Sequence, residues 1–164
     1  MSTDSVFARM NHRIHDVTGR LEWLPPVTIR IALGITFILS GWGKLHHLAQ
    51  VEQYFASLHI PAPGIQAPFV ATVELVGGVL VLLGLATRYA SLLLTGVMAV
   101  AIYTAIWPDA ASWTDVVGSL EVIYLLAFVQ LVVKGGGAAS LDHVIVRLVP
   151  ALQLEGTTAA PAAT

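Results

Sequence analysis

The chain has 164 residues, of which 56% are hydrophobic and only 11% are charged. Because soluble domains usually carry about 25% charged residues, this composition argues against a soluble protein and favours one bundle of helices that faces lipid. The net charge of −2 gives no basic face for nucleic acid, and the absence of cysteine excludes disulfides, thiol redox chemistry and thiolate metal sites. Electrons in any redox reaction therefore have to pass through a bound cofactor or a partner.

The N-terminal part leads into the first predicted membrane span. Residues 1–26 precede it, and apolar residues at helical spacing over 6–21 are typical either of a helix on the membrane surface or of a partly ordered tail. The first span is predicted at about 27–44, with Pro25 and Pro26 at its start, where a missing N–H costs little. Arg30 lies within about a turn of that end, so we expect it to snorkel to the headgroups.

Three further apolar runs follow a short amphipathic segment. Residues 46–59 place their apolar side chains on one helical face, which predicts a helix on the membrane surface. The runs at about 67–87, 89–107 and 116–133 are each close to the ~20 residues that cross the hydrocarbon core. Since only a helix satisfies its own backbone in lipid, the sequence predicts an all-α membrane protein: a four-transmembrane-helix bundle with short amphipathic interfacial helices.

The C-terminal part predicts one more short helix and then a tail. Gly135, Gly136 and Gly137 end the fourth span, and Ser140 can cap a helix over 141–149. The membrane domain is therefore expected at 27–150. Residues 151–164 are expected to be a disordered tail, in which 156–164 are small and polar.

The basic residues predict the orientation. Seven of the eight Lys and Arg residues flank the ends of the spans that share a side with the N-terminus, and only Lys44 lies on the other side. This positive-inside pattern places both termini in the cytoplasm. Trp42, Trp107 and Trp113 then fall near the outer interface, as aromatic belts do.

Several short strings resemble the DoxX family of small bacterial membrane proteins. They are Arg30-x3-Gly34 leading to Ser40-Gly41-Trp42-x-Lys44-Leu45, then Val73-Glu74-Leu75-x-Gly77-Gly78 with Leu82-Leu83-Gly84-Leu85-x-Thr87-Arg88, and last Lys134-Gly135-Gly136-Gly137 with Ser140-Leu141-Asp142. The resemblance runs from about residue 27 to 145. It implies a four-helix bundle in the bacterial inner membrane and a part in membrane redox biology. Family members are linked to thiosulfate:quinone oxidoreduction and to oxidoreductase complexes that handle oxidative stress.

The function that follows is a subunit of a membrane-associated oxidoreductase system at the quinone pool. The resemblance supplies no catalytic mechanism, and relatives that oxidise thiosulfate work with a second subunit, so a protein partner or a soluble oxidoreductase is expected. Whether the chain is itself an enzyme stays open. The alternatives are a non-catalytic anchor or assembly partner for a soluble enzyme, and a small transporter, which would need to form a homo-oligomer.

Three ionisable residues are predicted to meet in the outer third of the bundle. Glu74 lies about 10 Å deep in the second span, Glu121 lies about five residues into the fourth, and Lys44 ends the first. Gly34 and Gly41 share a face of the first helix with Arg30, and Gly77 and Gly78 flank Glu74, so the first and second helices should pack closely. We therefore expect Lys44 near Glu74.

Two interpretations of this cluster stay open. In the structural one, Lys44 and Glu74 neutralise each other and fix helix register, while Glu121 bonds Tyr103 or a water. In the functional one, Glu74, Glu121 and Lys44 form a catalytic, proton-handling cluster for a quinone, whose flat ring lies against Trp42, Tyr103 and Trp107.

The remaining charges are predicted to be structural. Arg30, Arg88 and Asp142 should all lie at the inner surface, where Arg88 and Asp142 either form an ion pair or remain solvated charges that set topology. His46 and His47 are adjacent and point about 100° apart on a helix, so no metal site is predicted.

Overall fold

The computed structural model describes residues 23–137 and 139–148, and within these ranges the chain is helical with no strand. Each helix arises from one of the apolar or amphipathic runs. In chain order they are α2 (Leu24–His46), α3 (Leu48–Ser57), α4 (Pro63–Leu83), α5 (Thr87–Ala101), the π-helix η1 (Ile102–Ile106), α6 (Trp113–Val117), α7 (Leu120–Lys134) and α8 (Leu141–Leu148).

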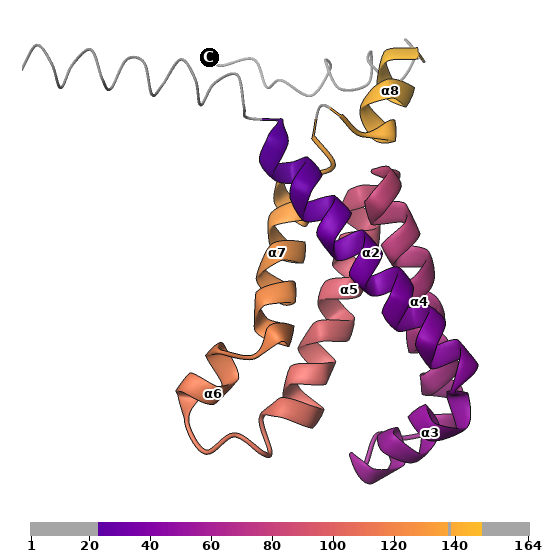
Figure 1. Cartoon of the computed structure of the whole chain (residues 1–164), viewed down its shortest axis with the longest axis vertical. Helices are drawn as coiled ribbons and strands as arrows, with labels where there is room; N and C mark the ends of the chain where they lie inside the picture. Colours follow the sequence, from indigo (N-terminus) through magenta and orange to yellow (C-terminus); the bar gives the residue numbers. More distant parts are fainter. Residues whose placement is uncertain (1–22, 138, 149–164) are drawn as a thin grey trace, which may run out of the picture.

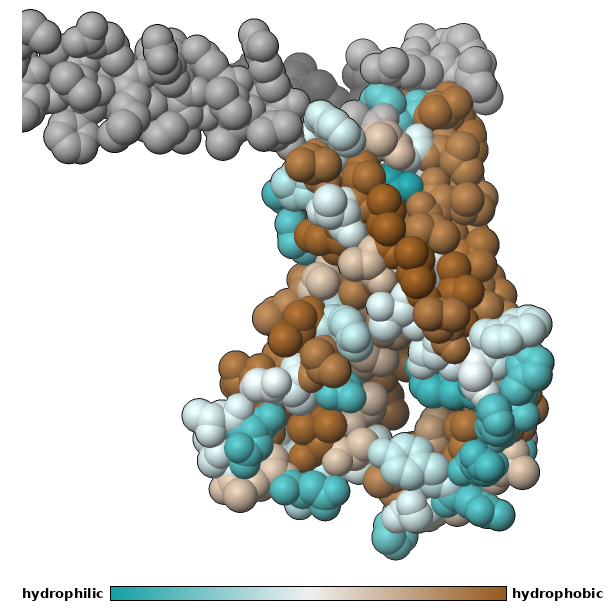
Figure 2. Space-filling model, viewed as in Figure 1, coloured by the Kyte–Doolittle hydropathy of each residue, from teal (hydrophilic) through white to brown (hydrophobic). Residues whose placement is uncertain are grey.

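The four long helices α2, α4, α5 and α7 form a bundle with short helices at both ends (Figure 1). α3 and α6 lie at one end, called here the α3/α6 end, and α8 lies at the other, called the α8 end. The most extensive packing joins α2 to α4 and α5 to α7. Apolar side chains cover much of the outer face of the bundle, while hydrophilic ones gather toward the ends (Figure 2), the distribution that a lipid-facing protein needs.

Three of the described helices are long and apolar enough to cross a membrane: Leu24–His46, Pro63–Leu83 and Thr87–Ile106. The run expected as a fourth span at 116–133 is divided. Ser112 and Asp115 form a capping box that starts α6, and Ser119 caps the start of α7. The 15 residues of α7 extend only about 22 Å at 1.5 Å per residue, so its length alone does not make it a full span.

The other boundaries differ from the predicted ones by a few residues. The second run, expected to continue to 87, ends at Leu83 because Gly84 adopts the left-handed conformation with φ +71°. Ala86 follows with φ +47°, and α5 then begins at Thr87. The short helices expected at 46–59 and 141–149 correspond to α3 and α8. The surface helix predicted over 6–21 and the tail predicted over 151–164 lie outside the described residues.

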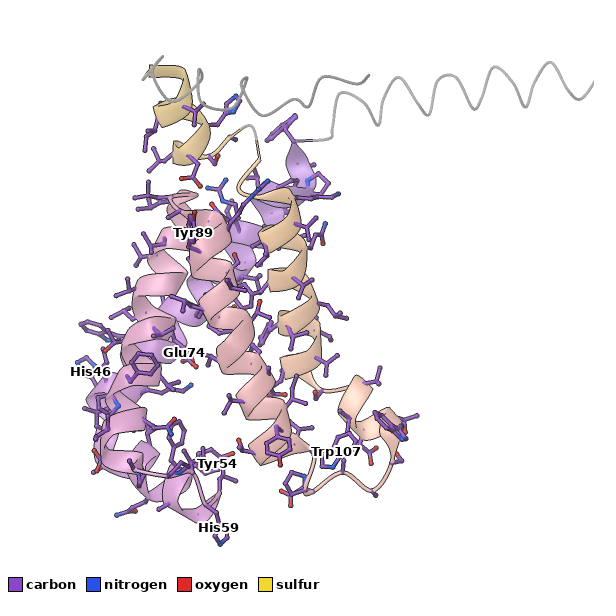
Figure 3. The ribbon with its side chains drawn as sticks, turned by 180° about the vertical axis from the view of Figure 1, so that it is seen from behind. His46, Tyr54, His59, Glu74, Tyr89 and Trp107 are labelled. Atoms are coloured by element: carbon purple, nitrogen blue, oxygen red, sulfur yellow. The ribbon has the colours of Figure 1, made fainter. Side chains whose placement is uncertain are left out.

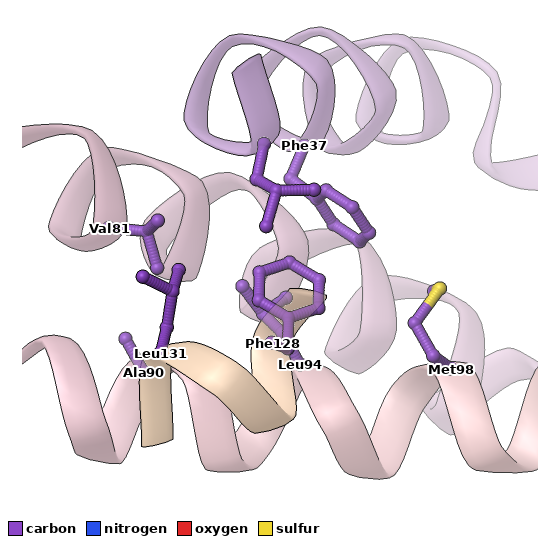
Figure 4. Close-up of a cluster of buried hydrophobic side chains, with 8 residues drawn as sticks. Phe37, Val81, Ala90, Leu94, Met98, Phe128 and Leu131 are labelled. Carbon is purple, nitrogen blue, oxygen red and sulfur yellow. The ribbon is translucent and has the colours of Figure 1, made fainter. Parts of the chain in front are cut away.

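A cluster of buried apolar side chains joins the four long helices (Figure 4). Phe37 of α2 packs edge-on against Phe128 of α7, with ring centroids 4.8 Å apart, and against Tyr124, at 5.5 Å. Leu94 and Met98 bring α5 into the same cluster. This core forms the floor of the pocket described below.

Glycines allow α2 and α4 to pack at backbone distance. A Cβ on Gly41 would collide with the backbone nitrogen of Leu75, and one on Gly78 would lie 2.8 Å from the nitrogen of Ile38. Small residues therefore set the separation and register of the two helices, as the sequence predicts. This register determines which polar side chains on α2 face α4.

Candidate functional site

A pocket of about 720 Å³ opens at the α3/α6 end. Its walls come from α2, α3, α4, α5 with η1, and α7, and they are mostly apolar. Figure 2 shows the surface open between α3 and the neighbouring part of the bundle at this end. The charged residues in the lining are Lys44, Glu74 and Glu121, the three that the sequence predicted to converge.

Glu74 is the most buried charged residue of this pocket, with 1% of its surface exposed. Its Oε1 accepts a hydrogen bond from Lys44 Nζ at 2.5 Å, and its Oε2 accepts one from Ser40 Oγ at 2.9 Å. Figure 3 shows Glu74 between the helices, with Tyr54 of α3 on the same open space. The carboxylate is therefore held by two side-chain donors, one on each oxygen.

The sequence explains why these three side chains meet. Ser40 and Lys44 are four residues apart, so they lie on one face of α2, and the contacts at Gly41 and Gly78 turn that face toward α4. Lys44 also lies in the last turn of α2, where the helix dipole favours a cation. About a third of the Lys44 side chain stays exposed, whereas Glu74 is enclosed.

Glu121 faces the same pocket from α7. It lies in the first turn of that helix, where the dipole favours an anion, and its side chain is half-buried. Within the described residues no hydrogen bond or ion pair is recorded for its carboxylate. Tyr103, the partner considered in the structural interpretation, is 75% exposed and does not line the pocket. Glu121 is therefore a second carboxylate on this hollow, with no protein partner found in the described part of the chain.

The aromatic residues of the pocket are not those chosen from the sequence. Trp42 is exposed and lies against His46 with the two ring planes tilted, while Trp107 is exposed and packs edge-on against Trp113. Neither tryptophan lines the pocket. The sequence indicated how deep these rings lie but not which way they face. The aromatic rings that do line the pocket are Phe37, Tyr54, Phe55, Phe69 and Tyr124. Of these, Tyr54 and Phe55 were visible beforehand as part of the apolar face of the 46–59 helix.

At the α8 end, Arg30 does not snorkel. It is only 4% exposed, and its guanidinium donates to four backbone carbonyls. Nε and Nη2 bond the oxygens of Val81 and Leu82 at the end of α4, while Nη1 bonds those of Gly136 and Ala139. The last carbonyls of a helix lack partners of their own, so a buried arginine there satisfies them.

Asp142 caps α5 instead of pairing with Arg88. Its Oδ1 accepts from the Ala86 N–H at 2.7 Å, and its Oδ2 accepts from the Thr87 N–H at 3.0 Å and from Thr87 Oγ1 at 3.2 Å. The free N–H groups at the start of a helix are better partners for the Asp142 carboxylate than the solvated guanidinium of Arg88 is. No ion pair joins Asp142 to the exposed Arg88 in the described residues. This capping was hidden in the sequence because Asp142 lies more than 50 residues from its partners.

The histidines of the α3/α6 end lie on the outside of the bundle. His46 and His47 each use Nδ1 to bond a backbone oxygen four residues earlier. Figure 3 shows His46 and His59 away from the pocket. Among the described residues no group of three or more His, Cys, Asp or Glu is arranged to hold a metal ion.

Comparison with known proteins gives a family match and two relatives. The DoxX family model matches residues 26–107, from α2 through η1. "Inner membrane protein YqjF" of Escherichia coli (strain K12) is 29% identical over 130 residues, which cover 77% of this chain and 95% of that protein. "Putative oxidoreductase CatD" of Bacillus subtilis (strain 168) is 32% identical over 116 residues, which cover 70% of this chain and 81% of that protein. No solved structure shows a significant match. The family and the apolar helices together place this chain in a membrane.

Proposed function

We propose that this chain, which belongs to the DoxX family, is the membrane subunit of an oxidoreductase system and binds a quinone in the pocket around Lys44 and Glu74. The observation that carries the proposal is the lining of this pocket. A largely apolar hollow of about 720 Å³ contains one ion pair, whose carboxylate is buried, and a second carboxylate. Ligand sites commonly combine apolar walls with a few polar groups that fix orientation.

The polar groups fit the head of a quinone. Ser40 and Lys44 line the wall of the pocket. The single O–H of Ser40 is donated to Glu74, whereas Lys44 has N–H groups beyond the one that it donates to Glu74, and a quinone presents carbonyl oxygens that accept such bonds. The apolar side chains of α3 and α5 suit an isoprenoid tail, and the aromatic rings suit a flat head group. Glu74 and Glu121 are carboxylates on the same space, so either can hold or release a proton there.

The proposal divides the chemistry between two proteins. Reduction of a quinone consumes two electrons and two protons, and the chain has no cysteine through which electrons could pass. The electrons come from a donor on a partner dehydrogenase, while the residues of this chain bind the quinone, exclude water and handle protons. One relative is named an oxidoreductase, which supports this role without identifying the electron donor.

The proposal includes four spans, with α7 as the fourth, both termini in the cytoplasm, and a bacterial inner membrane. Residues 122–133 of α7 are uncharged, and Lys134 at its end can snorkel, which helps a short helix match the bilayer. The distribution of Lys and Arg residues supports this orientation of the chain in the membrane. An impermeant maleimide applied to intact spheroplasts should label Ser57→Cys and not Ala163→Cys, in a chain that has no other cysteine. The reverse pattern would contradict this orientation.

The quinone site is tested by equilibrium binding of a short-chain ubiquinone and a short-chain menaquinone to the full chain in nanodiscs. We expect Glu74→Gln and Glu121→Gln each to weaken binding of the better ligand, by about tenfold for Glu74→Gln, because a hydrogen bond to a charged group is lost or misplaced there. Glu52→Gln is the matched control, since Glu52 is a carboxylate on α3 that does not line the pocket. Unchanged binding in a well-folded Glu74→Gln variant would remove the proposed role.

The same preparation separates the alternatives. A soluble oxidoreductase that co-purifies with the chain, while neither quinone binds, would identify a membrane anchor or assembly partner. Solute flux through proteoliposomes of the purified chain would identify a small transporter. A quinone that the wild-type chain retains through purification, and that the Glu74→Gln variant loses, supports the proposal.

A further inference from the structure

A second pocket, of about 590 Å³, lies at the α8 end, on the opposite side of the core from the proposed quinone site. It is bounded by the start of α5, the glycine loop 135–137 and the first turns of α8. Tyr89, which lines it, is labelled in Figure 3 near the end of the bundle that carries α8. Nothing in the proposed function uses this pocket.

The charge on this pocket is mostly positive. Arg88 and Lys134 both line it with exposed side chains, and within the described residues neither takes part in an ion pair. The Arg88 side chain lies over the loop, since a Cβ on Gly135 would be 3.2 Å from its Nε. Asp142 is the one acidic residue in the lining, and its carboxylate is already bonded to the N–H groups of Ala86 and Thr87. The two cations are therefore available to an anion.

An unpartnered ring nitrogen lies in the same lining. Nε2 of His143 is buried and has no hydrogen-bond partner among the described residues. Buried polar atoms in proteins nearly always have a partner, so this nitrogen is an independent sign of a ligand. In the tautomer that carries its proton on Nε2, His143 donates a hydrogen bond, which an anionic oxygen accepts.

The surroundings of the pocket identify the kind of anion. Leu141, Val144 and Ile145 follow one another at helical spacing on α8, and all three are exposed. A helix with such a face, placed at the end of a membrane bundle, lies at the level of the lipid headgroups. We propose that this pocket binds the phosphate of an anionic phospholipid, with Arg88 and Lys134 as its cationic partners, His143 as a donor, and α8 against the acyl chains.

The test measures lipid binding by the full chain. The protein is purified in mild detergent, and phosphatidylglycerol or phosphatidylcholine is titrated in while bound lipid is counted by native mass spectrometry. We expect phosphatidylglycerol to bind in preference to phosphatidylcholine. Arg88→Gln together with Lys134→Gln should weaken phosphatidylglycerol binding by about thirtyfold, because each basic residue near an anionic headgroup contributes about fivefold. Arg88→Lys with Lys134→Arg should retain most of it.

Controls distinguish a built site from overall charge and from soluble phosphate. Arg13→Gln with Arg20→Gln removes the same charge from the N-terminal segment and should weaken phosphatidylglycerol binding far less than the pocket pair does. An equal loss in this control pair would overturn the proposal, as would equal affinity for the two lipids. Thermal stabilisation by inorganic phosphate alone, lost in the Arg88 and Lys134 variant and without any preference for phosphatidylglycerol, would assign the pocket to a soluble phosphate and overturn the lipid assignment.

Discussion

The two ends of the bundle each hold a buried charged residue, but they use it differently. At the α8 end, the buried Arg30 bonds four backbone carbonyls, and the half-buried Asp142 bonds two backbone N–H groups. At the α3/α6 end, Glu74 is held by the side chains of Lys44 and Ser40 on the wall of a pocket. Charges bonded to the backbone are part of the fold, whereas a charge held by side chains can exchange its partner for a ligand.

The largest effect should come from Arg30→Met. Removing the guanidinium leaves the carbonyls of Leu82 and Gly136 without their donor and the carbonyl of Val81 with the Gly84 N–H alone, and unsatisfied buried carbonyls are costly. We expect a loss of at least about 3 kcal/mol in the free energy of unfolding, measured by denaturation with SDS in mixed micelles. Arg88→Met, which removes an exposed cation at the same end, should change stability by less than about 0.5 kcal/mol. Similar values for the two variants would erase the contrast between the ends.

A smaller effect is expected at the other end from Lys44→Met. It leaves the Glu74 carboxylate buried with only Ser40 as partner, and breaking a buried pair from one side destabilises strongly. Because Lys44 is partly exposed, we expect the free energy of unfolding to fall by about 2 kcal/mol in the same assay. This loss is smaller than that for breaking a fully buried ion pair. Adding Glu74→Gln should restore most of the loss. If the double variant is as unstable as the sum of the two single variants, the pair is not coupled.

The smallest effect should come from Asp142→Asn. The amide keeps one acceptor oxygen but loses the charge that favours the start of α5, so we expect a loss of about 1 kcal/mol. Hydrogen exchange should be the sharper measurement. It should speed up at the amides of Ala86 and Thr87 and remain unchanged near Glu74. Exchange that speeds up throughout the bundle would mean that the turn is not an independent local structure.

Much of this fold was predictable because lipid imposes simple rules. The apolar runs predicted the helices, and the spacing of Gly34 and Gly41 predicted that α2 packs on α4 with Lys44 near Glu74. The strings from Arg30 to Asp142 predicted the family, which the comparisons confirm. In each case the prediction depended on a pattern of residues within one helix or on the apolar composition that a bilayer requires.

What could not be predicted depends on partners far apart in the chain. The four carbonyls bonded by Arg30 belong to residues 51 to 109 positions away, and a carbonyl has no signature in the sequence. The end of α6 at Val117 and the cap at Ser119 divide an apolar run that hydropathy treats as continuous. The pocket is lined by Tyr54 and Tyr124 rather than by Trp42 and Trp107, because the depth of a residue in the membrane does not determine which face of its helix points inward.

The close contact between α2 and α4 also bears on how the protein enters the membrane. These helices are consecutive among the long ones, and Lys44 and Glu74 form an ion pair between them. A charged side chain at a bilayer centre costs about 2.5–3.5 kcal/mol on insertion scales when it enters alone. A hairpin of α2 and α4, joined through Gly41 and Gly78, carries the two charges in as one neutral unit. We therefore expect the insertion machinery to release this pair of helices together, so that Glu74 never faces lipid as an isolated charge.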